Sequence, residues 1–231
     1  MSNPAPIALV LEDEREIRHF VRLSLEAEGW LVFEAGTVKA GLIEAGTRRP
    51  DLVIADLGLP DGDGVDFIRQ VRTWSGVPII VLSARTQESE KVAALDAGAD
   101  DFITKPFGMA ELLARTRANM RRVRAGRTNA DAVFRCGDVE VDLSARVVRK
   151  AGTEVHLTPI EYRLLGVLIT NVGRVLTHRH LLREVWGPTH GDSTHYVRVF
   201  MGNLRQKLED DPAQPKHFVT ETGVGYRLLV D

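Results

Sequence analysis

Short apolar runs alternate with longer amphipathic stretches through the first half of the chain. The runs are typical of strands covered on both faces, and the stretches between them repeat apolar residues at helical spacing. The predicted strands are residues 7–11, 31–35, 52–56, 77–83 and 101–104. The predicted helices are residues 14–28, 37–47, 65–72, 88–97 and 109–123. Five strand–helix units in succession predict an α/β doubly wound domain with a five-stranded parallel sheet and right-handed crossovers.

The pattern changes after residue 124. Residues 125–131 are polar and lose the apolar period, so we expect a linker between a first domain, 1–124, and a second domain, 132–231. Short strands at close spacing open the second domain, predicted at residues 139–143, 146–150 and 153–157. They precede helices predicted at residues 158–171, 177–187 and 193–211, and a hairpin at 217–230. Thr158, Pro159 and Glu161 have the spacing of a capping box with proline in the first turn. This order predicts a small α+β domain with an antiparallel sheet.

Composition narrows the class of protein. The chain has 231 residues, is 44% hydrophobic and carries a formal net charge of −2. Its single cysteine, Cys136, excludes an intrachain disulfide and fits a reducing compartment. No apolar run approaches the ~20 residues of a membrane span, and the start lacks the basic region of a signal peptide. We therefore expect a cytoplasmic protein with no membrane partner.

Polar side chains follow four of the five strands of the predicted sheet. The first strand runs into Glu12 and Asp13, the third ends in Asp56, the fourth ends in Ser83, and the fifth leads to Lys105. If the first and third strands are neighbours, the three carboxylates converge at the carboxyl edge of the sheet. Packed carboxylates raise one another's pKa unless a cation lies among them, and Mg²⁺ prefers such oxygen ligands. The sequence therefore predicts a magnesium site at this edge.

This constellation suits phosphoryl transfer. Asp56 could be a nucleophile that forms an acyl phosphate, while Mg²⁺, Lys105 and Ser83 stabilise the phosphoryl oxygens. Taken singly, Asp56 is better explained as a turn cap and Lys105 as a solvated lysine; only the combination of motifs favours a functional site. Phosphatases with an aspartate nucleophile need a second aspartate two residues later, and Gly58 stands there, so we expect no general phosphatase.

The motifs "EDE" (12–14), "DLGLPDGDG" (56–64), "LSA" (82–84) and "DDFITKPF" (100–107) resemble those of receiver domains of bacterial response regulators. The resemblance covers residues 5–124 and implies a CheY-like, flavodoxin-like fold, phosphorylated by a sensor histidine kinase. It implies the following roles: phosphoacceptor, Asp56; metal ligands, Glu12, Asp13, Asp56 and the backbone carbonyl of Leu57; phosphoryl-binding and switch residues, Ser83, Lys105 and Phe102. It also implies a cis Lys105–Pro106 bond. Without the resemblance, Phe102 reads as a core residue.

A mixed-charge surface normally indicates only solubility. The resemblance instead implies a homodimer that forms on phosphorylation through pairs between subunits. The implied pairs are Lys91 with Glu111, Asp101 with Arg115, and Asp96 or Asp100 with Arg122.

The last predicted helix combines cationic and amide side chains with apolar residues that could pack inward. It is expected to present His195, Tyr196, Arg198, Asn203, Arg205 and Lys207, with Arg227 on the following hairpin. Alone, this pattern indicates an ordinary solvated helix. However, "LTPIEYRLL", "HYVRVFMGNLRQKLE" and "VTETGVGYRL" resemble the winged-helix effector domain of OmpR/PhoB-like regulators over residues 132–231. Helix 193–209 then corresponds to the recognition helix and 218–230 to the wing, although the helix has fewer arginines than is common.

The resemblance implies a transcriptional regulator whose partners are promoter double-stranded DNA, the kinase and RNA polymerase. Its only catalysis would be self-phosphorylation and acyl-phosphate hydrolysis in the receiver. Within the family, "GLPDGDG" and residues 194–227 resemble regulators of potassium-uptake operons. Regulation of another operon and regulation without phosphorylation both remain open alternatives.

Overall fold

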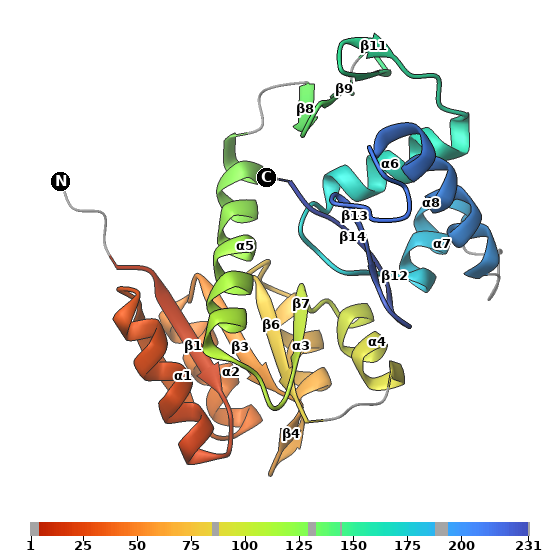
Figure 1. The fold of residues 1–231 in the computed structure, drawn as a ribbon. Coiled ribbons are helices and arrows are strands. Elements are labelled where there is room, and N and C mark those ends of the chain that lie inside the picture. Colours follow the sequence, from red (N-terminus) through yellow and green to blue (C-terminus); the bar gives the residue numbers. More distant parts are fainter. Residues whose placement is uncertain (1–4, 85–87, 129–132, 144, 188–193, 231) are drawn as a thin grey trace. The chain divides into compact units, whose positions relative to one another are not determined.

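The computed structural model describes residues 5–84, 88–128, 133–143, 145–187 and 194–230, with side chains of 122–128 excepted. The chain divides into two compact units, Met1–Val123 and Arg124–Asp231 (Figure 1). Each unit is described by itself. None of the described helices is long and apolar enough to cross a membrane.

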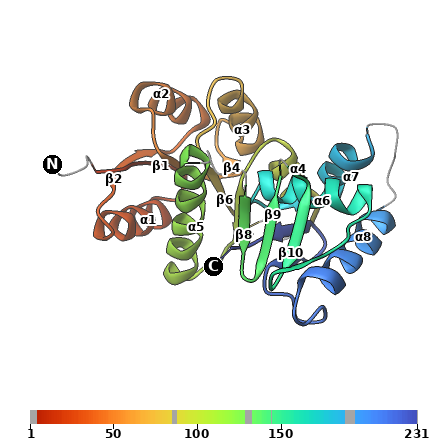
Figure 2. The ribbon, with the colours of Figure 1, turned by 90° about the horizontal axis from the view of Figure 1, so that it is seen from above.

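The first unit is a five-stranded parallel sheet in the order β2-β1-β3-β6-β7. Its strands are β1 (Ile7–Leu11), β2 (Leu31–Ala35), β3 (Leu52–Asp56), β6 (Ile79–Ser83) and β7 (Asp101–Thr104). Its helices are α1 (Arg15–Ala27), α2 (Val38–Arg48), α3 (Gly64–Arg72), α4 (Glu88–Asp96) and α5 (Met109–Thr128). Helices α1 and α5 cover one face of the sheet, and α2 and α3 the other (Figure 2). The predicted fold class and the adjacency of the first and third strands are confirmed.

The strand sequences explain the burial of this sheet. All five residues of β3 and of β6 are buried, as expected for central parallel strands with helices on both faces. Residues of β1, β3, β6 and β7 on one face pack with Val21 and Leu25 of α1 and Leu112 of α5. Helix α5 continues to Thr128, five residues beyond the predicted end at Val123. The residues after Val123 are polar, so no apolar period shows that they are helical. A polar segment can nevertheless continue a helix.

The second unit is a winged-helix domain. A four-stranded antiparallel sheet comprises β8 (Val133–Cys136), β9 (Val139–Asp142), β10 (Val147–Lys150) and β11 (Thr153–Glu154). Three helices follow: α6 (Pro159–Thr170), α7 (His178–Trp186) and α8 (Thr194–Leu208). Strands β12 (Leu176–Thr177), β13 (Phe218–Glu221) and β14 (Gly225–Leu228) form a three-stranded sheet. Sequence patterning missed β8 and β12, while the predicted capping box of α6 is present.

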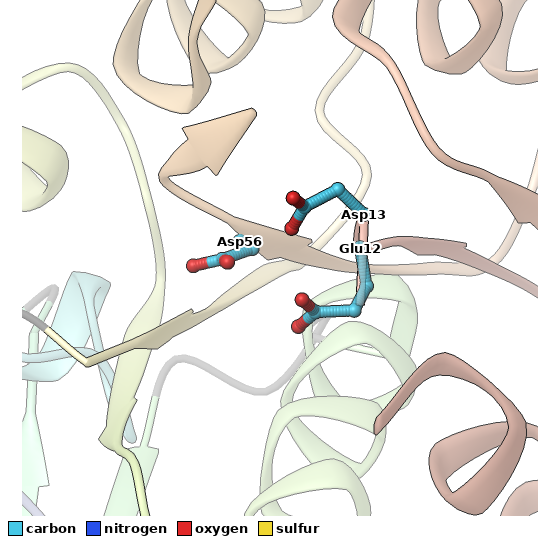
Figure 3. Close-up of side chains that lie close together, drawn as sticks. All are labelled: Glu12, Asp13 and Asp56. Carbon is cyan, nitrogen blue, oxygen red and sulfur yellow. The ribbon is translucent and has the colours of Figure 1, made fainter. Parts of the chain in front are cut away.

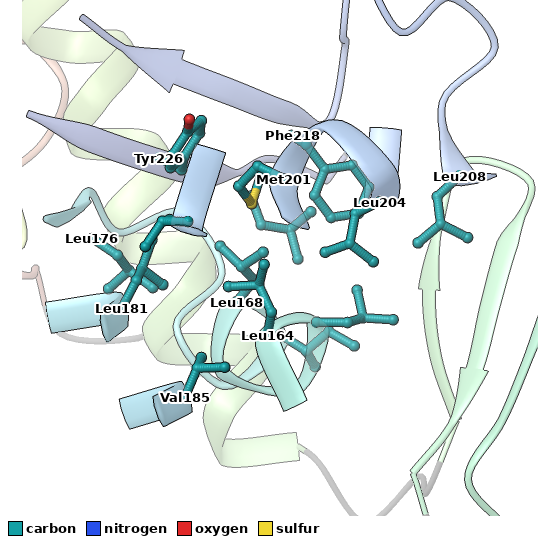
Figure 4. Packing of buried hydrophobic residues seen from close by; sticks show 14 of the residues in the cluster. Leu164, Leu168, Leu176, Leu181, Val185, Met201, Leu204, Leu208, Phe218 and Tyr226 are labelled. Atoms are coloured by element: carbon teal, nitrogen blue, oxygen red, sulfur yellow. The ribbon is translucent and has the colours of Figure 1, made fainter. Parts of the chain in front are cut away.

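The core of this unit lies between the three helices and the C-terminal hairpin. Leu164 and Leu168 of α6 and Met201 and Leu204 of α8 point into it, with Phe218 from β13 (Figure 4). The buried residues of α8 recur at helical spacing. One face of α8 therefore packs in the core, and the opposite face points outward.

Candidate functional site: a carboxylate cluster and an outward helix

Three carboxylates meet at the carboxyl edge of the parallel sheet. Glu12 and Asp13 directly follow β1, and Asp56 ends β3, which pairs with β1 in parallel register. One carboxylate oxygen of each lies within 4.8 Å of the others, with Asp13 exposed and Glu12 and Asp56 buried. Figure 3 shows the three side chains pointing toward a common space. The structure therefore brings together the predicted carboxylates.

Lys105 brings a positive charge to the same edge. Its Nζ lies 2.8 Å from Glu12 Oε2 and 3.0 Å from Asp56 Oδ2. The Lys105 amide donates to the Ser83 carbonyl at 2.8 Å, and Ser83 is buried at the end of β6. The Lys105–Pro106 peptide is cis, as the resemblance implied. Glu14, which the sequence did not single out, lies 3.6 Å from Lys105 Nζ.

Burial and charge act in opposite directions on these groups. Burial is the largest influence on the pKa of Glu12, and the nearby charge of Asp56 acts in the same direction; although the contact with Lys105 lowers it, the pKa is raised from 4.5 to about 7. Burial by itself would lower the pKa of Lys105, but its contacts with the carboxylates of Glu12 and Asp56 outweigh it and hold the pKa above its usual value. One ammonium group therefore does not fully neutralise the carboxylates around it.

The residues present fit a divalent cation. The donors are carboxylate oxygens, which are the ligands that Mg²⁺ prefers. Glu12 Oε2 is buried and has no well-aligned hydrogen bond, its contact with Lys105 being an ion pair. Glu12, Asp13 and Asp56 would hold the ion. The Leu57 carbonyl accepts a hydrogen bond from the Gly64 amide at 3.0 Å, which leaves one of its two lone pairs for a cation. Its role as a backbone ligand is an expectation from the resemblance.

The loop after Asp56 closes tightly over its own backbone. The Asp56 Oδ1 atom accepts a hydrogen bond from the Leu57 amide at 2.7 Å, and β4 (Gly58–Leu59) pairs with β5 (Gly62–Asp63). A Cβ atom added at Gly64 would lie 2.2 Å from the Asp56 carbonyl oxygen. Gly64 is therefore the residue that lets α3 start directly beside Asp56.

We expect Gly64→Ala to lower the free energy of unfolding of the first unit by about 2 kcal/mol, because backbone atoms cannot move aside without displacing Asp56. Native-state hydrogen exchange of β3 amides would measure it. Gly46→Ala is the matched control, since a Cβ there meets nothing within 4 Å. Equal protection in the two variants would contradict the close approach.

The face predicted for dimerisation contains ion pairs within one chain. Arg115 Nη1 lies 3.0 Å from Asp101 Oδ1, and its Nη2 lies 3.1 Å from Glu111 Oε1. Lys91 Nζ lies 5.0 Å from the centre of the Phe102 ring, a cation–π contact. The predicted interface and switch residues thus contact one another on α4, β7 and α5.

Asp100 differs from its neighbours on this face. Its side chain is buried, and Oδ2 lies 2.7 Å from Arg72 Nη2 and accepts a hydrogen bond from the Ile79 amide. Asp96 is exposed, so it is the better placed of the two candidates for an interchain contact with Arg122. The side chain of Arg122 lies outside the described residues.

Helix α8 exposes part of the predicted DNA-contact set. His195, Tyr196 and Arg198 are exposed, and Asn203 is half-buried. Arg205 is turned to the wing: Nε donates to the Phe218 carbonyl at 2.9 Å and Nη2 to Thr220 Oγ1 at 2.7 Å.

Two further predicted contacts are ion-paired inside the domain. Lys207 Nζ lies 2.6 Å from Glu161 Oε2, and Arg227 Nη2 lies 2.8 Å from Glu221 Oε1. Arg227 is only 5% exposed. The cations at the end of α8 and on the wing therefore bind the domain's own groups.

Lys207→Met should lower the free energy of unfolding of the second unit by about 2 kcal/mol at pH 7, because buried Glu161 loses its cation. Burial by itself would raise the pKa of Glu161, but the contact with Lys207 and the hydrogen bonds from Thr158 keep it below 4.5. A carboxyl group whose pKa is lowered by folding stabilises the folded state at pH values above its unfolded pKa. That stability is lost as the pH falls through the folded-state pKa. The loss of stability caused by Lys207→Met should therefore shrink below pH 4.5. The control Lys216→Met, at an exposed lysine, should change the stability little. Hydrogen exchange of the α6 amides measures the stability of both variants.

Family models match both units. A response regulator receiver domain model matches residues 8–117, and a model of the C-terminal domain of transcriptional regulatory proteins matches residues 152–228. The chain belongs to the two-component response regulators that carry an OmpR/PhoB-type winged-helix effector domain.

Curated relatives are similar over nearly the full length. The KDP operon transcriptional regulatory protein KdpE of Escherichia coli K12 is 59% identical over 222 residues, covering 96% of this chain and 98% of the relative. The KdpE of Mycobacterium tuberculosis H37Rv is 49% identical with the same coverage. Among solved structures, the response regulator DrrB of Thermotoga maritima, an OmpR/PhoB homologue, aligns with a TM-score of 0.51 at 27% identity. That alignment covers 97% of this chain and 99% of DrrB.

Proposed function

We propose that Asp56 accepts a phosphoryl group from a sensor histidine kinase, and that the phosphorylated chain forms a homodimer that binds promoter DNA. The observation that carries this proposal is the convergence of Glu12, Asp13 and Asp56 with Lys105 at the carboxyl edge of the sheet. A buried acid beside an ammonium group and a metal-binding pair is the arrangement that phosphoryl transfer to a carboxylate requires.

In the transfer, an ionised Asp56 oxygen bonds to phosphorus while the bond from phosphorus to the donor's imidazole nitrogen breaks. Lys105 shifts its hydrogen bond from Asp56 toward a phosphoryl oxygen, and the Ser83 hydroxyl donates to another. Glu12 and Asp13 would hold Mg²⁺, which would supply positive charge for the phosphoryl oxygens when bound. The acyl phosphate later reacts with water, so the chain returns to its starting state without being a general phosphatase.

Phosphorylation adds about two negative charges to this edge. We propose that Ser83 and Phe102 respond, and that the face formed by α4, β7 and α5 then pairs with a second copy. Arg115, Asp101 and Glu111 exchange their intrachain contacts for interchain ones, Lys91 takes part, and Asp96 meets Arg122. A dimer places two effector domains on adjacent half-sites and raises affinity through effective concentration.

The proposed target is a kdp potassium-uptake operon, with a KdpD-like kinase as donor and RNA polymerase as a further partner in the cytoplasm. Identity of 59% with the E. coli KDP operon regulator supports this choice. Of the α8 residues that the sequence predicted to contact DNA, the proposed contacts are His195, Tyr196, Arg198 and Asn203.

A binding measurement tests the proposal as a whole. After treatment with acetyl phosphate and Mg²⁺, the chain should bind a kdp promoter duplex at least about tenfold more tightly than the untreated chain. Equal affinity would favour a regulator that acts without phosphorylation. Sustained turnover of p-nitrophenyl phosphate would instead favour an enzyme, which the glycine at position 58 argues against.

A further inference from the structure

Helix α8 has one uninterrupted outward stripe. Its buried residues Val197, Met201, Leu204 and Leu208 are spaced by four, three and four, so they occupy one side of the helix. The opposite side carries the exposed residues His195, Val199, Gly202 and Gln206 at the same spacing. Val199 is 44% exposed, although its side chain is apolar.

The long cations of the helix do not lie on this stripe. Arg205 is tied to the Phe218 carbonyl and Thr220, and Lys207 to Glu161. At 100° per residue, Arg198 falls nearer to the buried side than Val199 and Gln206 do. The centre of the outward face is therefore neutral, and Arg198 borders it.

The stripe includes residues that are poor choices for an exposed helix. Glycine and β-branched valine are weaker helix formers than alanine. A Cβ at Gly202 would meet nothing within 4 Å, so no packing among the described residues calls for glycine there. Gly41 of α2 is the contrast, because a Cβ there would lie 3.0 Å from Leu11. Gly46 of α2 and Gly166 of α6 are equally free of neighbours, so the lack of packing does not by itself mark Gly202. What distinguishes Gly202 is its place on the outward stripe of α8 beside exposed Val199, where an external partner can approach closely.

We infer that Val199 and Gln206 are the specificity-determining residues of α8, and that they read a thymine methyl group and an adenine edge. This inference rests on the proposed DNA-binding function. An apolar side chain suits the thymine methyl, and a glutamine amide forms two hydrogen bonds with adenine N6 and N7. Gly202, between them, lets the helix approach the groove floor.

The spacing sets the geometry of the half-site. Seven residues of α-helix separate Val199 from Gln206, which is about 10.5 Å along the axis. At about 3.4 Å per base pair, the two contacts lie roughly three base pairs apart. The predicted half-site therefore has a thymine and an adenine at this separation, with Arg198 on a bordering phosphate.

Gly202→Ala separates binding from folding. The new methyl group should stabilise α8, which raises the melting temperature of the full-length chain, yet hold the helix away from the DNA. We expect a raised melting temperature and at least about tenfold weaker binding to a duplex enriched by the wild type. Gly166→Ala on α6 is the matched control, because its added Cβ also meets nothing within 4 Å. Unchanged affinity of Gly202→Ala would overturn the close approach.

Base substitution tests the two contacts. The acetyl phosphate-treated chain would select from a randomised duplex pool, and each thymine of the enriched site would then be replaced by deoxyuridine, which lacks only the methyl. One replacement should weaken wild-type binding by about fourfold, the value of one buried methyl group, and should not affect Val199→Ala. Gln206→Glu should select cytosine in place of adenine at one position, because a carboxylate accepts from cytosine N4.

The outcomes separate this inference from the function on which it rests. If the wild type enriches no duplex, DNA binding by the chain is refuted. If the wild type enriches a site but Val199→Ala and Gln206→Glu enrich the same site with the same methyl dependence, the assignment of these residues is refuted. Arg198→Ala should weaken all duplexes alike and reduce the salt dependence.

Discussion

Asp56→Asn is expected to abolish phosphoryl uptake from acetyl phosphate, with the initial rate falling by about a thousandfold or more. An amide oxygen is not a nucleophile that can form a stable acyl phosphate, and the neighbouring carboxylates of Glu12 and Asp13 are the proposed ligands of the metal ion. The asparagine keeps the size of the side chain, and its oxygen can still accept the hydrogen bond that Leu57 donates to Asp56 at 2.7 Å. The variant should therefore remain folded. Intact-protein mass spectrometry after incubation with acetyl phosphate and Mg²⁺ measures the uptake directly.

Asp66→Asn is the matched control for this experiment. Asp66 lies on α3, ten positions after Asp56, and its side chain is exposed and paired only at the surface with Arg69. The substitution Asp66→Asn removes the same charge from the same domain without touching the site. Phosphoryl uptake by this variant should therefore equal that of the wild type. Phosphorylation of Asp56→Asn at the wild-type rate would show that Glu12, Asp13 or another group is the acceptor.

The site was predictable because it follows from strand order and chain direction. Apolar runs placed β1 and β3, and the carboxyl edge of a parallel sheet collects whatever follows its strands. Glu12, Asp13, Asp56 and Lys105 accordingly come together as expected, although 49 residues separate Asp56 from Lys105 in the chain. The contact of Glu14 with Lys105 depends on how the chain turns into α1, which no periodicity encodes.

The orientation of the charged side chains was less predictable. Arg205 and Lys207 look like DNA contacts because they are cationic residues on a helix with an apolar face. Their partners, Phe218 and Glu161, are distant in sequence or on another element, and long flexible side chains can reach either way. The apolar residues at 197, 201, 204 and 208 carried the better signal, since the outward stripe is simply their opposite face.

A similar ambiguity affects Asp100. In sequence it adjoins Asp101 and reads as part of the same charged surface. In the structure Asp100 binds Arg72. Arg72 also donates to the carbonyls of Gly98 and Val77, and so ties together the segments that lead into β7 and β6. The partner comes from the end of α3, 28 residues earlier, and nothing in the local pattern identifies it.

Lys105→Met should lower the free energy of unfolding of the receiver by about 3 kcal/mol at pH 8 without Mg²⁺, because two buried carboxylates lose their common cation. Glu12 is fully buried, and Lys105 is 2.8 Å away. Methionine preserves the length of the side chain, so most of the effect comes from charge. Native-state hydrogen exchange of β1 and β3 amides in the full chain isolates the receiver from the effector domain.

The pH dependence identifies the group responsible. In the wild type, the folded-state pKa of Glu12 is about 7, above 4.5, so the folded state holds a proton there that the unfolded state has lost. The stability associated with that proton is present at low pH and declines as pH rises through 7. Removing Lys105 raises the pKa of Glu12 further, and the loss of stability should continue to higher pH. The difference between variant and wild type should accordingly be small at pH 6 and largest at pH 8.

Mg²⁺ and a second lysine complete the experiment. A bound divalent cation replaces the missing positive charge, so saturating Mg²⁺ should recover most of the stability of Lys105→Met at pH 8. Lys39→Met removes an exposed ammonium from α2 and should change stability little at either pH. A penalty for Lys105→Met that is independent of both pH and Mg²⁺ would mean that the lysine stabilises the receiver by packing alone, and that the three carboxylates do not form a cation site.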